Sequence, residues 1–251
     1  MPPKKLPGET PPKRLTGNAP KTAAKKRTLR ERLPWLPYVA PLALFLLLTL
    51  LEGQFGAAYP LLYAVKLVLV TWVFWSLRRF LPEVRFERTG LGLAIGLGVA
   101  LAVVWVLGDR LTGLLHLHFA FLGNRTGFDP VREIPNVGLR AVFLVVRFYG
   151  LVLVAPVVEE LFYRGFLLRY VTDPDDFRRV PLGRFNGMAF GVNVGLMAVS
   201  HPEWLVAGLF SAAMCALLAR TRSLSACIVA HGVTNLALGV YVLVSHDWKF
   251  W

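Results

Sequence analysis

Cysteine is scarce in this sequence, and the patterns of the commonest nucleophilic and zinc hydrolases are missing. The 251 residues include 2 cysteines, Cys215 and Cys227, both inside long apolar stretches. A structural disulfide is therefore not expected, and both thiols are assigned to the apolar interior. No GxSxG motif occurs, and HExxH is absent. The usual nucleophile and zinc-peptidase patterns are thus excluded.

Charged residues are also absent from long parts of the chain. Hydrophobic residues make up 55% of the sequence, and the mean hydropathy is +0.54. A helix needs about 20 apolar residues to cross the hydrocarbon core of a bilayer. We therefore predict an all-α polytopic membrane helix bundle with seven transmembrane helices. The predicted spans are 35–51, 58–77, 90–108, 137–170, 185–200, 204–219 and 223–244, and the short apolar piece 111–122, an interfacial or re-entrant segment, would make an eighth.

The basic residues fall on one side of this predicted bundle. Lysine and arginine number 28 against 15 acidic residues, which gives a formal net charge of +13. With a cytoplasmic N-terminus, twenty of these basic residues lie on the cytoplasmic side of the spans and four on the opposite side. The excess follows the positive-inside rule, so the expected partner is the lipid bilayer and no nucleic-acid partner is expected.

The first 33 residues differ in composition from the rest of the chain. Residues 1–33 are rich in proline, lysine and arginine and nearly lack bulky apolar groups, so we expect a disordered basic cytoplasmic tail. Contact of this tail with anionic lipid is a second option. Residues 34–251 then form the transmembrane domain. The first apolar run is longer than a signal-peptide core and lacks a small-residue cleavage site, so no cleavable signal peptide is expected.

Three ionisable residues interrupt an otherwise apolar span. Residues 155–165 read APVVEELFYRG and place Glu159, Glu160 and Arg164 at membrane depth, where ionisable groups are costly and functional by default. Arg164 follows Glu160 by four residues, the favourable spacing for an ion pair on a helix. Adjacent helical residues point about 100° apart, so Glu159 needs a separate explanation. Pro156 removes a helix hydrogen bond, which is tolerated where the backbone lines a cavity.

Two further polar clusters lie downstream. SHPEW at 200–204 puts His201 between two predicted spans, and HGVTN at 231–235 puts His231 and Asn235 one turn apart on one helix face. Taken singly, His201 is explained as a loop histidine at the membrane interface. His231 and Asn235 are explained by a hydrogen bond between helices. Depths counted from the cytoplasmic helix ends allow both clusters to converge with Glu159 on one cavity near mid-membrane.

Such a set of side chains suits amide hydrolysis. The reaction needs a base that activates water and donors aimed at the oxygen of the tetrahedral intermediate. A buried carboxylate such as Glu159 can be the base, and His201 can orient the water or hold its proton. The N–H donors of His231 and Asn235 suit the oxyanion. Zinc is the nearest alternative, because the glutamate and both histidines can also ligate this metal. We expect no metal and no other cofactor.

Together, EExxxR at 159–164, the histidine at 201 and HxxxN at 231–235 resemble the three motifs of the CAAX protease and bacteriocin-processing (CPBP) family. These are glutamic-type intramembrane proteases that include CAAX prenyl endopeptidases. The likeness covers about residues 137–244, the predicted catalytic core. DFRRVPLGRF, HPEW and WKFW resemble more narrowly the CAAX-protease-related subgroup of bacteria with exosortase and PEP-CTERM sorting systems.

The resemblance implies a role for each motif. The first glutamate and the first histidine act on the water, the HxxxN pair binds the oxyanion, and the second glutamate and the arginine support them. Met197 stands where the family usually has phenylalanine, so altered contacts near the scissile peptide are expected and no lost chemistry. The implied site residues are Glu159, Glu160, Arg164, His201, His231 and Asn235.

The implied substrate is a membrane-associated peptide or protein, and a prenyl group is not required by the resemblance. The compact chain favours the bacterial plasma (inner) membrane, with the N-terminus cytoplasmic. Two other functions stay open at this point. One is a non-catalytic membrane binding or maturation partner that retains the fold. The other is a transporter with a proton relay through Glu159, which the lack of visible repeats disfavours.

Overall fold

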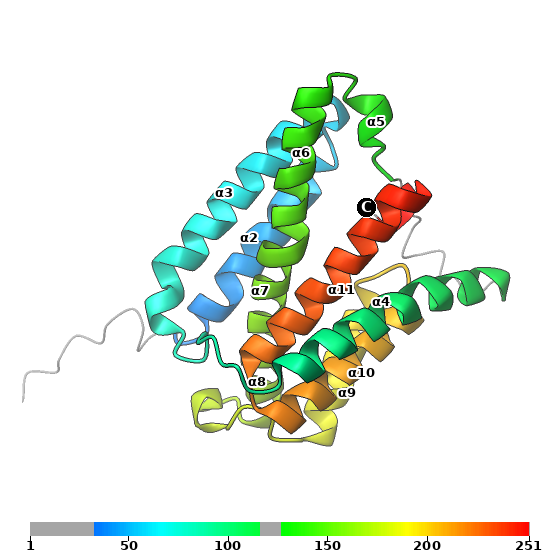
Figure 1. The fold of residues 1–251 in the computed structure, drawn as a ribbon. Coiled ribbons are helices and arrows are strands. Elements are labelled where there is room, and N and C mark those ends of the chain that lie inside the picture. Colours follow the sequence, from blue (N-terminus) through cyan, green and yellow to red (C-terminus); the bar gives the residue numbers. More distant parts are fainter. Residues whose placement is uncertain (1–32, 116–126, 251) are drawn as a thin grey trace, which may run out of the picture.

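The chain is helical throughout the part that the structure describes. This computed structural model describes residues 33–115 and 127–250, and no strand occurs within these ranges (Figure 1). The predicted tail lies outside the described residues, apart from Leu33. Of the short piece 111–122, only residues 111–115 are described. All seven predicted spans fall on helices. These are α2 (Leu36–Glu52), α3 (Tyr59–Leu77), α4 (Leu91–Leu114), the segment containing α6 (Val137–Tyr149), α7 (Ala155–Glu160) and α8 (Leu168–Thr172), and then α9 (Gly187–Val199), α10 (Trp204–Thr221) and α11 (Leu224–Ser245).

Five helical segments are long and apolar enough to cross a membrane. They are Tyr59–Phe80, Leu91–Leu114, Val137–Thr172, Trp204–Thr221 and Leu224–Ser245. The other two predicted spans are shorter, since α2 has 17 residues and α9 has 13. At 1.5 Å per residue α9 is roughly 20 Å long, which is less than the ~30 Å hydrocarbon core. The five segments indicate an integral membrane protein, and the count of seven or eight spans stays a prediction.

Polar caps fix where several of the helices begin. The side chain of Asn136 accepts a hydrogen bond from the backbone N–H of Leu139 at the start of α6. Asn186 caps α9 in the same way, and Ser223 caps α11. Each cap satisfies a backbone donor that the first turn of a helix leaves unpaired. The starts of α9 and α11, which lead toward two of the site histidines, are thereby set by the sequence.

The helices form two groups that meet along α11. In Figure 1, α2 and α3 lie beside the long segment α6–α8, whereas α9 and α10 lie together with α4 and α11. Small residues let α11 come close to its neighbours. A Cβ atom at Gly98 of α4 or at Gly232 of α11 would collide with backbone carbonyl oxygens of the facing segments. Thr234 of α11 also donates a hydrogen bond to the carbonyl of Gly98, 3.0 Å away.

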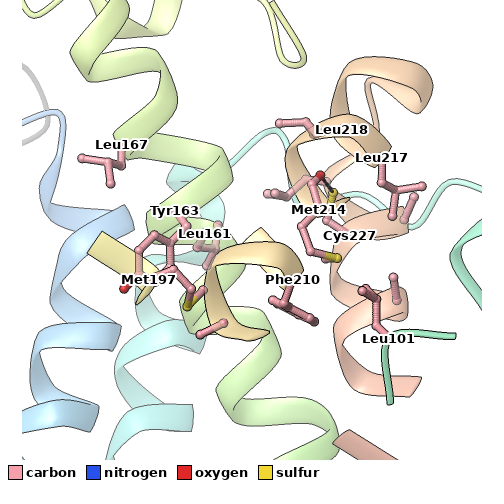
Figure 2. Packing of buried hydrophobic residues seen from close by; sticks show 14 of the residues in the cluster. Leu101, Leu161, Tyr163, Leu167, Met197, Phe210, Met214, Leu217, Leu218 and Cys227 are labelled. Carbon is pink, nitrogen blue, oxygen red and sulfur yellow. Dashed lines mark hydrogen bonds between the residues drawn. The ribbon is translucent and has the colours of Figure 1, made fainter. Parts of the chain in front are cut away.

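The largest apolar core joins the second group to the middle of the long segment. Figure 2 shows Leu161 and Tyr163 near Met197, with Phe210, Met214 and Cys227 contributed by other helices. These side chains are almost fully buried within the protein. Both cysteines are free thiols in buried positions, as the sequence predicts. The core therefore holds the EExxxR segment against α9, α10 and α11.

The basic connections share one end of the bundle. In Figure 1 the connections 78–90, 173–186 and 222–223 lie at the lower end, and the α2–α3 connection lies at the upper end with α5 (Pro130–Glu133). The lower end thus carries the loops that the sequence assigns to the cytoplasm.

Candidate active site

The two glutamates lie on a short α-helix between two π-helical stretches, and Arg164 lies in the second of these stretches. Gly150–Val154 and Leu161–Leu167 are π-helical, and α7 carries both glutamates between them. A π turn inserts an extra residue into the helical ladder and is frequent at functional sites. The segment thus departs from regular α-helix on both sides of the two carboxylates.

Pro156 leaves one carbonyl of the first π stretch available to another helix. The N–H of Ala155 bonds to the carbonyl of Gly150, five residues back. In this pattern the next donor would be the nitrogen of Pro156, which carries no hydrogen, and its acceptor would be the carbonyl of Leu151. Asn235 of α11 takes that place, because its Nδ2 donates to the Leu151 carbonyl at 2.9 Å. The bond uses one of the two amide hydrogens of Asn235 and fixes the side chain beside Glu159.

One imidazole lies between the two glutamates. The Nδ1 atom of His231 is 2.9 Å from Oε1 of Glu160, and its Nε2 is 3.9 Å from Oε2 of Glu159. Since a carboxylate accepts hydrogen bonds, Nδ1 is the donor in the first contact. Adjacent residues on a helix point in different directions, yet both carboxylates meet this ring because α11 lies against α7. Phe210 packs against the ring, with centroids 4.9 Å apart.

Glu160 and Arg164 form a fully buried ion pair behind the imidazole. Both side chains are 0% exposed, and Nε of the arginine is 3.3 Å from Oε2 of the glutamate. Arg164 also donates from Nη2 to the carbonyl and the hydroxyl of Ser211. That hydroxyl donates to the amide oxygen of Asn193, 3.1 Å away. The amide nitrogen of Asn193 donates in turn to the carbonyl of Tyr163. This network ties the second glutamate to α9 and α10.

His201 is held by the backbone of the turn that follows α9. Its Nδ1 is 3.0 Å from the carbonyl of Met197, which can only accept, so Nδ1 carries the proton and Nε2 is the acceptor nitrogen. The ring of Trp105 on α4 stands edge-on to the imidazole, with centroids 5.9 Å apart. The turn and α4 together set the direction of this side chain.

A cavity of about 430 Å³ joins these side chains. Four of the six residues predicted from the motifs line it, namely Glu159, His201, His231 and Asn235. Glu160 and Arg164 do not line it, which agrees with their complete burial. The cavity thus brings together three motifs from segments far apart in the sequence.

The cavity extends toward the end of the bundle opposite the basic connections. Its lining includes Glu52 and Tyr59, which flank the α2–α3 connection, and Phe250, which follows α11. Lys249, next to Phe250, lies 2.6 Å from the carboxylate of Asp109 on α4. Partial burial lowers the pKa of Lys249, but the hydrogen bond and the opposite charge of Asp109 outweigh it and raise the pKa overall. The C-terminal segment is therefore fixed at the rim by an ion pair.

No metal-binding cluster occurs in residues 33–115 and 127–250, where no group of three or more His, Cys, Asp and Glu side chains is arranged to hold an ion. His231 already uses Nδ1 to contact Glu160 and turns Nε2 toward Glu159. The expectation of a metal-free site stays a prediction.

Several residues of the site were not recognised from the sequence. Asn193 and Ser211 complete the network of Arg164, and neither belongs to a motif. Lys66 is 2% exposed and pairs with Glu52 at 2.5 Å, and neither residue belongs to a motif. The proximity of Glu52 across the α2–α3 hairpin was the missed signal. Arg147 also lines the cavity.

Comparison with known protein families agrees with the motifs. Residues 141–237 match the family model described as type II CAAX prenyl endopeptidase Rce1-like. The matched segment contains all six predicted site residues and runs from α6 into α11. No curated protein and no solved structure matched the chain.

The match is a likeness to CAAX prenyl endopeptidases over these residues, and the five apolar segments indicate a membrane protein. They support the CAAX protease family that the three motifs predict. The narrower likeness to the exosortase-associated subgroup stays a prediction.

Proposed function

We propose that this protein is a glutamic-type intramembrane endopeptidase that hydrolyses a peptide bond of a membrane-associated protein or peptide with an activated water. One observation carries the proposal. His231 lies between Glu160 and Glu159, at 2.9 and 3.9 Å, in a segment that lines a cavity within the apolar helices. Two carboxylates at membrane depth are costly unless they are used or compensated. Arg164 compensates Glu160, whereas Glu159 lines the cavity, where the proposed reaction would use it.

The reaction begins with Glu159. Its carboxylate takes a proton from water as the water oxygen forms a bond to the carbonyl carbon of the scissile peptide. Nε2 of His201, the acceptor nitrogen of that ring, orients the same water. The protonated Glu159 then gives its proton to the leaving nitrogen as the C–N bond breaks. The products are a carboxylic acid and an amine, which become a carboxylate and an ammonium group when the acid proton passes to the amine, and the glutamate returns to its starting state.

The oxyanion of the tetrahedral intermediate is held from α11. Asn235 has a second amide hydrogen besides the one bonded to Leu151, and it donates this hydrogen to the oxyanion. His231 donates from Nε2 when its ring is doubly protonated.

The substrate reaches this site from the non-cytoplasmic side. The cavity extends toward Glu52, Tyr59 and Phe250, at the end of the bundle opposite the basic connections. By the positive-inside rule that end faces away from the cytoplasm. The bacterial plasma membrane, with the N-terminus cytoplasmic, is the proposed setting.

Single-turnover cleavage in H₂¹⁸O tests the mechanism. Purified protein in detergent micelles is incubated with apolar membrane peptides, and the products are analysed by mass spectrometry. Direct attack by water puts ¹⁸O into the new carboxylate of the product in the first turnover. A label that instead appears on the enzyme would indicate a covalent intermediate and would overturn the proposal.

A chelator separates the glutamate mechanism from its zinc-dependent alternative. Both Glu159 and His231 turn ligand atoms toward the cavity, so the metal alternative has a specific basis. Cleavage that persists with chelator supports the glutamate mechanism, and loss that zinc restores supports the metal. Binding of peptides without any cleavage by the wild type would favour the non-catalytic partner.

A further inference from the structure

The catalytic cavity has a second polar end, far from the glutamates. Besides the site residues, three charged side chains line it, namely Glu52, Lys66 and Arg147. They come from the end of α2, the first half of α3 and the last turn of α6. We call this set the charged end of the cavity. Neither the proposed hydrolysis nor the matched motifs give these three residues a role.

Lys66 and Glu52 form a tight pair in the charged end. Their side chains are 2% and 7% exposed, with Nζ 2.5 Å from Oε1 of the glutamate and 3.0 Å from the hydroxyl of Thr49. The aromatic rings of Tyr63 and Phe45 flank the ammonium group, with centroids 4.5 and 4.6 Å away. The pair is therefore internally neutral and held rigidly.

Arg147 places a guanidinium group in the charged end. Its guanidinium lies over the ring of Tyr63, 4.7 Å from the centroid, and the residue is 9% exposed. The three lining charges thus comprise two cations and one carboxylate. A guanidinium that lines a cavity among apolar helices attracts a ligand of opposite sign, because the interaction is weakly screened there. A planar guanidinium also matches the geometry of a carboxylate.

The distance between Arg147 and Glu159 sets how far from the cleaved bond Arg147 would contact a substrate. Arg147 and Glu159 lie twelve residues apart on one continuous helical segment, which corresponds to no more than roughly 18 Å along the axis. An extended peptide rises about 3.3 Å per residue. About five residues of substrate would therefore span the cavity from the cleaved bond to the guanidinium.

We propose that the charged end binds a carboxylate of the substrate about five residues from the scissile bond. The carboxylate is either an acidic side chain or the C-terminus of the peptide, and Arg147 is its main contact. Oε2 of Glu52 is buried with no hydrogen-bond partner among the described residues, so it is placed to accept a neighbouring N–H of the same peptide. This inference rests on the proposed peptidase function and adds a substrate class to it.

Peptides with a movable charge test the proposal. The probes are apolar peptides of Leu, Ala and Val in dodecyl maltoside micelles, in which one Asp is shifted residue by residue from the cleaved bond. Asn at the same place is the neutral reference, and free and amidated C-termini separate the two sources of carboxylate. The wild type should favour Asp, or the free C-terminus, at about five residues by roughly tenfold to a hundredfold in kcat/KM.

Variants on α6 provide the control. Arg147→Gln should abolish the preference while the Asn peptide is still cleaved, and Arg147→Lys should keep part of it. Arg140→Gln should leave it intact, since Arg140 contacts carbonyls of Val131 and Ile134 outside the cavity. A preference that is absent, or unchanged in Arg147→Gln, overturns the proposal. The proposal is also overturned if the wild type shows no preference and phosphatidylglycerol stabilises the protein only when Arg147 is present, because Arg147 would then bind lipid.

Binding separates this inference from the proposed function. Affinity of the same labelled peptides for Glu159→Gln protein is measured by fluorescence anisotropy, which requires no turnover. Charge-dependent binding without cleavage by the wild type would retain the charged end as a carboxylate site and reject the peptidase. Cleavage without any dependence on charge would retain the peptidase function and reject the charged end as a carboxylate site.

Discussion

His231 donates a hydrogen bond from Nδ1 to Oε1 of Glu160, 2.9 Å away. The bond fixes the ring plane and turns Nε2 toward the carboxylate of Glu159, which lines the cavity. The two adjacent glutamates therefore differ in environment, because one is enclosed with Arg164 and the other faces the hollow. This difference yields separate expectations for stability and for activity.

Replacing Glu160 should lower the stability of the protein. Glu160→Gln keeps the shape but removes the charge that compensates Arg164, and both side chains are 0% exposed. Breaking a buried ion pair from one side costs about 3–5 kcal/mol. Thermal unfolding in detergent should show a clear fall in Tm. Glu133→Gln is the matched control, because Glu133 is half-exposed and pairs with exposed Arg132. Equal Tm values for the two variants would contradict the ion pair's role.

Asn235 should serve both the backbone of Leu151 and the reaction. Asn235→Ala is expected to lower turnover about 10²- to 10³-fold by loss of an oxyanion donor. It should also cost about 1–3 kcal/mol of stability by leaving a buried carbonyl unpaired. Pro156→Ala supplies a backbone N–H near that carbonyl. The double variant should regain stability without regaining activity, and recovery of both would show that the amide is purely structural.

The Lys66–Glu52 pair should behave as a unit. Lys66→Met leaves Glu52 as an uncompensated buried charge, so a loss of about 3–5 kcal/mol is expected. Adding Glu52→Gln removes that charge and should recover most of the loss. A double-mutant cycle of unfolding free energies measures the coupling. Additive losses would mean that the two side chains do not stabilise each other.

Met197 should tolerate the family's phenylalanine at a cost in stability. The side chain is 1% exposed, so Met197→Phe overfills the core by an amount that typically costs about 1–3 kcal/mol. The backbone carbonyl still accepts from His201, so turnover should persist while peptide preference changes. Complete loss of cleavage in a folded variant would show that the methionine side chain is needed for the chemistry.

The sequence predicts the helices and the motif residues because both leave local patterns. The seven apolar runs all fall on helical segments of the described residues, and the spacing of Glu160 and Arg164 predicts their ion pair, which the structure confirms. The helical spacing of His231 and Asn235 likewise places both on the cavity side of α11. Length, in contrast, does not decide whether α2 and α9 cross the membrane.

Contacts across helices could not be predicted in this way. That one imidazole meets two adjacent carboxylates depends on how closely α11 approaches α7, which glycines permit but do not specify. The π-helical stretches depend on the backbone hydrogen bonds of the whole segment. Pro156 alone therefore indicated only that one helix hydrogen bond is missing. The pairing of Lys66 with Glu52 required the α2–α3 hairpin to close.

The cleavage rate of Glu159→Gln protein tests the central claim most directly. The variant removes the proposed base from the cavity and leaves the buried Glu160–Arg164 pair intact, so Tm should stay near that of the wild type. Peptide hydrolysis should fall about 10²- to 10⁴-fold, whereas Glu133→Gln protein should cleave at the wild-type rate. A folded Glu159→Gln protein that cleaves membrane peptides as fast as the wild type would contradict the account.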